Sequence, residues 1–395
     1  MSNGRENNSI ASWQQVQGIY VHIPFCVQKC LYCDFTSYAC YDAVFMKKYT
    51  DALCREMRYK SRQKIDLHKN ATVYFGGGTP SVLPAEYIEQ IVNCLKDNGF
   101  WQQPQEATIE VNPGTADFNK LQKLKAMGFD RISFGVQSLN DEELKAIGRI
   151  HTAEEAAEAV KMAEKAGFTR INADLIYGLP GQTIKSLKKT LNEIIAMNIE
   201  HLSVYGLILE DGTPSYDLVE NGKILLPDED TCADMYELVQ ETMIKHGYER
   251  YEISNYAKNK GYSRHNLVYW HYYPYLSFGA AACGFDGTKR LTGIEDLKKY
   301  VQQASADKFI YNEEKLTKEE QLSEFMFMNL RKVEGADLRE AYTRFGADIY
   351  HDYADELKSF FDKNLLEYDE ETQILRLTSA GMELGNQIFE IFVRV

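Results

Sequence analysis

The chain has 395 residues and carries 44 Lys and Arg against 58 Asp and Glu, which gives a formal net charge of −14. This acidic balance excludes a main role in binding the phosphate backbone of nucleic acids. The length is sufficient for two domains, and no apolar run reaches the roughly 18 residues that a transmembrane helix needs.

The start of the chain is polar and contains no apolar signal core, so residues 1–17 are predicted to be a loose tail. Without a signal peptide, the protein is expected to be cytoplasmic, with its eight cysteines reduced. Cys40, Cys54, Cys94 and Cys232 have no ligand-like spacing and are interpreted as packing or surface residues.

Apolar, β-branched runs alternate with stretches of helical periodicity between residue 18 and about residue 209. The predicted strands are 18–25, 71–75, 107–111, 131–134, 170–177 and 201–205, and the predicted helices are 41–62, 84–98, 116–127, 152–166 and 183–197. This alternation predicts βαβ units, a parallel sheet and the α/β class. Six units are too few for a complete eight-unit barrel.

Three cysteines, Cys26, Cys30 and Cys33, follow the first predicted strand at the spacing CxxxCxxC. A [4Fe-4S] cluster normally takes four Cys ligands, so three thiolates would leave one iron open for chemistry. Half of a zinc site is an alternative, although structural zinc sites take four ligands. Disulfides are disfavoured because nothing indicates an oxidising compartment.

Polar and glycine residues end the strands that follow. Gly76-Gly-Gly-Thr-Pro80 follows the second strand, where glycines let the backbone approach a ligand closely. Glu110 and Asp174 lie inside apolar strands, where a carboxylate needs a salt bridge or a bound ligand. Arg149 follows a short helix. Its side chain either caps that helix or pairs with the carboxylate of a ligand.

The texture of the sequence changes in the last third. Residues 236–315 are predicted to be an aromatic-rich connecting region that contains His265-Asn-Leu-Val-Tyr-Trp270. Imidazole is a usual axial ligand of heme iron, but a polar loop histidine packed among aromatic residues is the alternative. Residues 316–395 combine helices with two strands near 364–378, which indicates an α+β winged-helix-like domain whose many acids argue against DNA reading.

The joint occurrence of HIPFCxxxCxYC, GGGTPS, EVNP, SFGVQS and DLIYGLPGQT resembles the radical S-adenosylmethionine (SAM) superfamily. It resembles in particular the branch that contains the oxygen-independent coproporphyrinogen III oxidases and the similar heme chaperones. The resemblance implies a partial (βα)6 TIM-like barrel over residues 18–235 and a [4Fe-4S] cluster on Cys26, Cys30 and Cys33. The residues it implies for the SAM pocket are Tyr20, Tyr32, Gly77, Gly78, Thr79, Glu110, Gln137, Arg149 and Asp174.

Two features favour the chaperone branch over the oxidases. Phe35 stands where the oxidases have a further Cys, and the segment before Tyr20 is short. The HNxxYW signature of the chaperones is present, which implies heme binding through His265, whereas Cys283 replaces a His found in related sequences. The expected function is delivery of heme to respiratory or membrane heme proteins. The alternatives are oxidative decarboxylation of coproporphyrinogen III and radical SAM methylation of heme.

Overall fold

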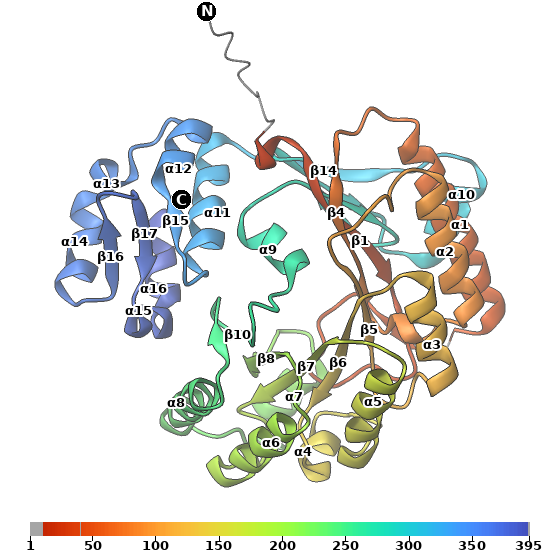
Figure 1. Cartoon of the computed structure of the whole chain (residues 1–395), viewed down its shortest axis with the longest axis horizontal. Coiled ribbons are helices and arrows are strands. Elements are labelled where there is room, and N and C mark those ends of the chain that lie inside the picture. The colour runs from red at the N-terminus through yellow and green to blue at the C-terminus, as the bar shows by residue number, and fades with distance from the viewer. Residues whose placement is uncertain (1–10, 40, 394–395) are drawn as a thin grey trace, which may run out of the picture.

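The first half of the chain forms an open barrel of parallel strands covered by helices (Figure 1). The computed structural model describes residues 11–39 and 41–393. The barrel strands are β1 (Val16–Ile23), β4 (Leu67–Gly77), β5 (Ala107–Val111), β6 (Arg131–Gln137), β7 (Arg170–Tyr177) and β8 (His201–Gly206). Their helices are α1 (Ala43–Ser61), α2 (Ala85–Asp97), α3 (Phe118–Met127), α4 (Asp141–Ala146), α5 (Ala153–Lys165) and α6 (Ile184–Ala196). The predicted partial barrel is thereby confirmed.

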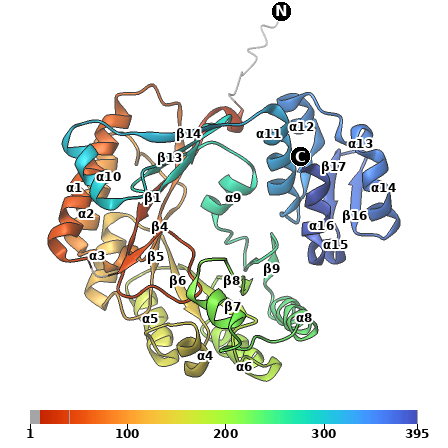
Figure 2. The ribbon, with the colours of Figure 1, turned by 180° about the vertical axis from the view of Figure 1, so that it is seen from behind.

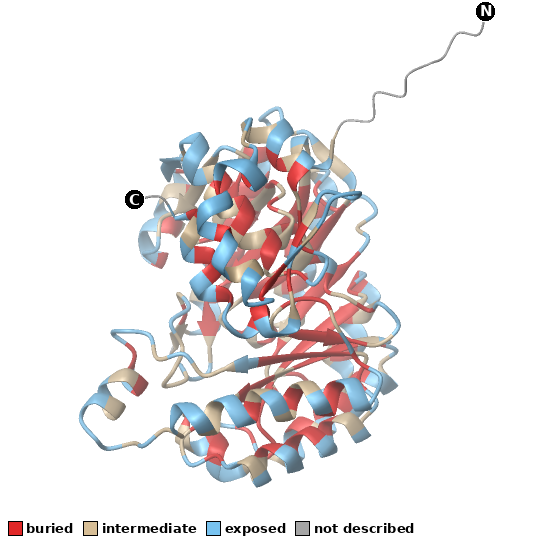
Figure 3. Cartoon of the chain, turned by 90° about the vertical axis from the view of Figure 1, so that its left-hand side faces the viewer, coloured by how far each residue is buried: buried red, intermediate tan, exposed pale blue. Residues whose placement is uncertain are grey.

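Local sequence signals explain these elements. Helices α1, α3, α5 and α6 each begin after a side chain that accepts the backbone N–H three residues further on, and these caps are Asp42, Asp117, Thr152 and Thr183. Along the strands, alternate side chains such as Ile19, Val21 and Ile23 are fully buried against the helices. Figure 3 shows the resulting buried sheet beneath helices whose outer faces are exposed.

The start of the chain departs from the expected tail. A 3-10 turn, η1 (Ser12–Gln14), precedes β1, which begins at Val16 rather than at residue 18. Gln17 is buried, and its backbone N–H donates to the carbonyl of Pro274 at 2.8 Å. The end of the predicted tail is therefore part of the sheet. Cys40 lies outside the described residues.

The sequence predicts a connecting region over residues 236–315. In the structure, strands from these residues extend the sheet at both edges. Beyond β8 lies β10 (Asn255–Ala257), which is antiparallel to β8. Next to it lies β9 (Glu249–Arg250), which is antiparallel to β10. Beyond β1 lie parallel β11 (Tyr275–Phe278) and antiparallel β12 (Cys283–Phe285), β13 (Lys289–Gly293) and β14 (Tyr311–Lys315). The associated helices are α7 (Pro214–Glu220), α8 (Glu229–Lys245), α9 (Arg264–Trp270) and α10 (Leu297–Ser305). The predicted boundary at residue 235 falls inside α8.

The C-terminal domain has its own hydrophobic core, built around residues such as Phe325, Leu375 and Phe392. Its elements are α11 (Lys318–Leu330), β15 (Ala336–Asp337), α12 (Leu338–Phe345), α13 (Ile349–Asp352), α14 (Ala354–Asp362), β16 (Leu366–Asp369), β17 (Ile374–Leu377), α15 (Ser379–Glu383), α16 (Gly385–Phe389) and η3 (Glu390–Phe392). A three-stranded sheet in the order β15-β17-β16 packs with these helices, which agrees with the winged-helix-like expectation.

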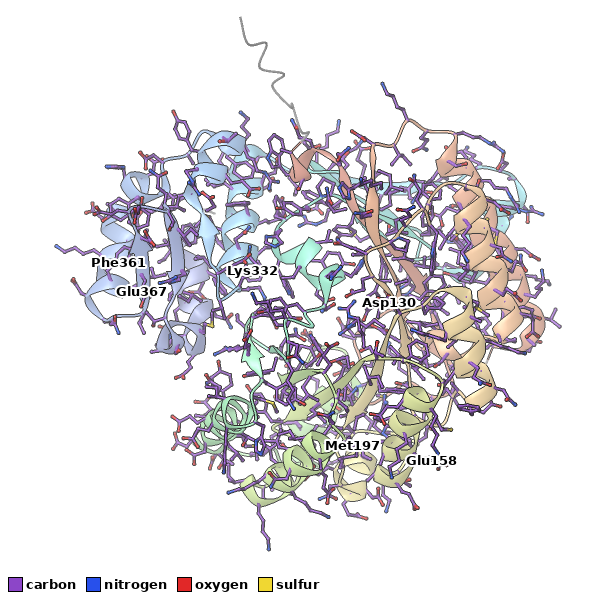
Figure 4. All side chains as sticks on the ribbon, in the orientation of Figure 1. Asp130, Glu158, Met197, Lys332, Phe361 and Glu367 are labelled. Atoms are coloured by element: carbon purple, nitrogen blue, oxygen red, sulfur yellow. The ribbon has the colours of Figure 1, made fainter. Side chains whose placement is uncertain are left out.

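Helix α9 lies between the barrel and the C-terminal domain, as Figures 1 and 2 both show. Figure 4 labels Lys332 on the side of the C-terminal domain that faces this helix. The Lys332 Nζ lies 2.7 Å from Nδ1 of His271, the residue that follows α9. The Tyr272 hydroxyl donates to Glu324 of α11 at 2.8 Å. In the described ranges, no helix combines the length and the apolar character needed to cross a bilayer.

Candidate functional site

The loop that carries the three spaced cysteines lies beyond the carboxyl end of β1 and is held by backbone hydrogen bonds. Cys26 ends the short strand β2 (Phe25–Cys26), which pairs with β3 (Tyr38–Ala39). The Leu31 N–H donates to the carbonyl of Ile147 at 3.1 Å, and the Leu31 carbonyl accepts from the Ser215 N–H at 3.0 Å. Contacts from α4 and α7 thus fix the loop from both sides.

Cys26, Cys30 and Cys33 border one cavity of about 140 Å³. The Cys26 Sγ lies 3.6 Å from Oγ1 of Thr79, and Arg149 donates through Nη1 to the Cys30 Sγ at 3.4 Å. Burial raises the pKa of the Cys26 and Cys33 thiols. Within the described ranges, no three His, Cys, Asp or Glu side chains form a group that could hold a single metal ion. Cysteine thiolates are the ligands of iron–sulfur clusters, in which each cysteine binds a different iron, so three thiols on one cavity supply the donor type that such a cluster needs.

The glycine turn after β4 forms part of the same cavity and fits closely against the cysteine loop. A Cβ at Gly78 would lie 2.8 Å from the Phe25 carbonyl oxygen and 3.0 Å from the Cys26 Sγ. Gly77 has φ +114°, and a Cβ there would lie 2.5 Å from the His22 ring. Only glycine allows this approach, so the turn can pack directly against the cysteine loop and bring its backbone to the cavity that the thiols line.

Arg149 reaches the cavity from the segment after α4. It donates to the Asn112 Oδ1 at 3.0 Å and to the carbonyl of Gly135, while its Nε is buried without a hydrogen-bond partner among the described residues. A buried donor left unpaired is costly, and a bound ligand would satisfy it. Arg149 is therefore a positioned cation beside the thiols. Its backbone N–H donates to the Leu144 carbonyl at the end of α4 at 2.9 Å, but its side chain is directed to the cavity wall and not to α4.

Glu110 and Asp174 line the same cavity as the cysteine loop, and together with Cys33 they also line a second, adjoining cavity of about 440 Å³. Glu110 accepts from the Tyr74 hydroxyl at 2.7 Å, and Asp174 accepts from Nδ2 of Asn172 at 2.8 Å. Burial raises the pKa of Glu110 to about 7 and also raises the pKa of Asp174. Both carboxylates are buried and hydrogen-bonded, and among the described residues neither has a cationic side chain within ion-pair distance.

Most of the predicted pocket residues meet at these cavities. The residues that line the thiol cavity are Tyr32, Gly77, Gly78, Thr79, Glu110, Gln137, Arg149 and Asp174. Gln137 holds a left-handed φ of +67° at the end of β6. Tyr20 does not line either cavity, and its hydroxyl instead bonds His22 Nδ1 at 3.0 Å.

Sequence reasoning missed Asn112, which joins two predicted residues. Its Nδ2 donates to the Thr79 Oγ1 at 2.8 Å, and its Oδ1 accepts from Arg149. Asn112 belongs to the EVNP motif, so its place at the end of β5 was a usable signal. Cys54 and Cys94 are buried between α1 and α2, and Cys232 is half-buried, as predicted for packing residues.

His265 is fully buried on α9, and both of its ring nitrogens have protein partners. Nδ1 lies 2.7 Å from the Thr72 Oγ1, and Nε2 lies 2.8 Å from the Tyr269 hydroxyl. Burial lowers the pKa of His265 to about 3, so the ring is neutral. A heme-ligand role for His265 stays a prediction, and it would require the imidazole to give up one of these bonds.

Comparisons with known proteins agree with this geometry. Residues 20–194 match the radical SAM superfamily, and residues 316–384 match the HemN C-terminal domain. A solved structure described as coproporphyrinogen III oxidase (HemN) from Escherichia coli superposes with a TM-score of 0.81 at 24% identity, covering 97% of this chain and 91% of that one. That likeness establishes the fold.

Curated relatives extend the similarity over nearly the whole length. The protein named heme chaperone HemW of Lactococcus lactis subsp. lactis is 35% identical over 96% of this chain and 98% of its own. The protein of the same name from Bacillus subtilis is 36% identical over 96% and 99%, and that from Escherichia coli is 31% identical over 95% and 97%. The chain therefore belongs to the radical SAM superfamily and, within it, to the family of proteins named heme chaperone HemW.

Proposed function

We propose that this protein is a heme chaperone that holds a [4Fe-4S] cluster, binds SAM beside it, and passes heme to acceptor proteins. The observation that carries the cofactor part is the single cavity that three thiols share with Arg149, Glu110 and Asp174. The heme part is supported by the printed name of relatives that match nearly the whole chain.

Cys26, Cys30 and Cys33 would hold the cluster. Three ligands leave one iron for the amino and carboxylate groups of SAM, and one-electron reduction of the sulfonium is the chemistry that such a cluster supplies when bound. Arg149 neutralises negative charge next to Cys30, and the Gly78 backbone leaves room beside Cys26. The chain thus contributes ligands, a counter-charge and space.

Glu110, Asp174 and Gln137 would orient SAM in the two adjoining cavities. SAM carries a positive sulfonium, an amino group that is neutral when it binds iron, and one carboxylate. Buried carboxylates on β5 and β7 can accept from the amino N–H groups and complement the sulfonium, and the unpaired Nε of Arg149 complements the carboxylate. Gly77, Gly78 and Thr79 supply backbone and hydroxyl groups to the lining of the thiol cavity.

The larger cavity argues against coproporphyrinogen III as the substrate. Its lining contains four carboxylates, Asp34, Glu110, Asp174 and Glu210, and one basic side chain, Arg131. Coproporphyrinogen III carries four propionates and heme carries two, so such a wall disfavours the porphyrinogen more strongly than heme. Phe35, which replaces the further oxidase Cys, lies on the rim of this cavity with 72% of its surface exposed.

The decisive experiment uses the anaerobically reconstituted protein and two assays in parallel. The chaperone proposal expects saturable heme binding by absorption spectroscopy and no conversion of coproporphyrinogen III with SAM and a reductant. Robust conversion would favour the oxidase alternative, and a methylated heme product would favour the methyltransferase alternative.

A comparison of His265→Ala with the wild-type protein tests the heme part of the proposal. If His265 ligates iron during transfer, this variant should change the heme spectrum or the occupancy while the cluster iron stays constant. Unchanged heme spectra would remove His265 as a ligand, and Cys283→Ser then tests the thiol that replaces the family's His. Acceptors are proposed to be respiratory or membrane heme proteins, and transfer from the loaded chain to an apo-acceptor tests that step.

A further inference from the structure

A continuous line of contacts joins the HNxxYW segment to the carboxylate wall of the proposed SAM site. The His265 ring stacks on the Tyr74 ring with centroids 4.9 Å apart and an interplanar angle of 22°. The Tyr74 hydroxyl donates to the Glu110 Oε1 at 2.7 Å. Glu110 in turn lines both cavities. Tyr74 itself lines the larger cavity, so one aromatic contact separates His265 from the site, and one further hydrogen bond leads to Glu110.

The imidazole that begins this line is held rigidly. Thr72 also donates to the carbonyl of Gln17 at 3.4 Å, so its oxygen is free to accept from Nδ1–H of His265. Nε2 then accepts from the Tyr269 hydroxyl, and each of these groups is satisfied. A Cβ at Gly18 would lie 3.2 Å from the His265 Cε1, so β1 packs directly against the ring.

The backbone beneath His265 is anchored to the barrel as well. The buried carboxylate of Glu106 accepts the N–H groups of Arg264 and His265, both at 3.0 Å. Glu106 also forms an ion pair with Arg170 at 2.8 Å. The first turn of α9 is thus fixed to β5 and β7, which gives the imidazole a defined position against Tyr74.

We propose that His265 is a positioning residue for the SAM site: its ring holds Tyr74 in the orientation in which the Tyr74 hydroxyl fixes Glu110. This inference rests on the proposed role of Glu110 in SAM binding. It gives the signature histidine a function at the barrel site that needs no bond to iron. The ring supplies a flat surface, and Tyr74 transmits its position to the carboxylate.

The alternative is that His265 only fills space, and the surroundings of Glu110 define the measurement that separates the two roles. The charged and titratable groups that act on Glu110 are Tyr20, Tyr74, Arg131, Asp174 and Tyr269. Of these, Tyr74 makes a direct hydrogen bond to the carboxylate. Removing the Tyr74 hydroxyl should therefore change both the SAM affinity and its dependence on pH.

The experiment measures SAM binding by calorimetry on the anaerobically reconstituted full chain. Tyr74→Phe keeps the ring and removes the hydroxyl, and we expect roughly tenfold weaker binding, the usual effect of losing a hydrogen bond to a charged group. His265→Ala should weaken binding by a similar factor. The double variant should bind no more weakly than Tyr74→Phe alone, because both changes act through the same bond.

Conservative variants keep the test informative if His265→Ala folds poorly. His265→Phe retains a ring that can stack on Tyr74, so it should restore most of the SAM affinity. Matched controls are Tyr272→Phe, which removes a hydroxyl bonded to Glu324, and His271→Ala, which removes the histidine that follows α9. Both controls should leave SAM affinity unchanged.

Two results distinguish failure of this inference from failure of the proposed site. If Glu110→Ala binds SAM like the wild type, Glu110 is not part of the site and the proposed function needs revision. If Glu110→Ala weakens binding but Tyr74→Phe and His265→Ala behave like the controls, the positioning role is overturned. Additive losses in the double variant would also overturn it, because they would mean that His265 acts independently of Tyr74.

Discussion

The cysteine loop and His265 lie near opposite ends of strand β1. The two regions differ in whether their buried polar groups have hydrogen-bond partners. Beyond the end of β1, the three thiols line a cavity, and the neighbouring Arg149 Nε has no hydrogen-bond partner in the described part of the chain. Beside the start of β1, His265 is completely buried, and both of its nitrogens are bonded to protein. An incompletely satisfied site indicates a missing ligand, whereas a satisfied one indicates a structural or positioning role.

Removing the thiols tests the incomplete end of this comparison and should give the largest effect. Cys26→Ser, Cys30→Ser and Cys33→Ser should each lose most of the roughly four irons per chain expected after anaerobic reconstitution. Cys232→Ser, a half-buried cysteine away from the cavity, is the matched control and should keep its iron. Full iron content in all three single variants would contradict the assignment.

Removing His265 tests the region beside the start of β1, where the polar groups have hydrogen-bond partners. His265→Ala leaves a cavity and strips a partner from Thr72 and Tyr269, so we expect the free energy of unfolding to fall by about 2–4 kcal/mol. Denaturation of the chain without cofactors measures this, and the exposed His351→Ala should change stability by less than about 0.5 kcal/mol. Equal stability of the two variants would mean that the packing and hydrogen bonds of His265 contribute little to the free energy of unfolding.

Truncating a wall carboxylate sharpens the comparison within the site itself. Asp174→Ala should weaken SAM binding by about 1–3 kcal/mol, because a buried charged hydrogen-bond partner is lost. Glu158→Ala on the exposed face of α5, labelled in Figure 4, removes an acid far from the cavities and should have no effect. Unchanged SAM affinity together with reduced thermal stability of Asp174→Ala would assign that residue a purely structural role.

The smallest expected effect is on pH dependence. Burial raises the pKa of Glu110 from 4.5 to about 7, so in this window the folded state keeps a proton that the unfolded chain releases. The contribution of Glu110 to stability therefore declines as the pH rises from about 4.5 to about 7 and is constant above that. A cationic ligand favours the ionised carboxylate, so SAM affinity should increase several-fold between about pH 6 and about pH 8. A similar increase in Glu110→Gln would show that another group is responsible.

Local signals in the sequence were sufficient for the strand–helix alternation, the cysteine loop and the carboxylates, whereas the partial barrel was expected from the family resemblance. Strand alternation, helix caps and the spacing of Cys26 and Cys33 all depend on residues close together in the chain. The extra strands were missed because they are short and pair across long separations, as when Tyr275 lies opposite Gly18. The hydrogen bonding of His265 could not be predicted for the same reason, because its partner Thr72 comes from a strand that is distant in the sequence.

The pairing of β11 with β1 also bears on how this protein is made. During synthesis, β1 and the cysteine loop leave the ribosome long before Tyr275–Phe278 exist, so the second edge of β1 stays unpaired until most of the chain has been translated. The contacts that pin the loop, from Ile147 and Ser215, arrive earlier. A nascent chain stopped between these points would possess all six barrel strands and a pinned cysteine loop on a sheet with an open edge. Under the proposed function, the cluster site would therefore be formed before β11 completes the sheet.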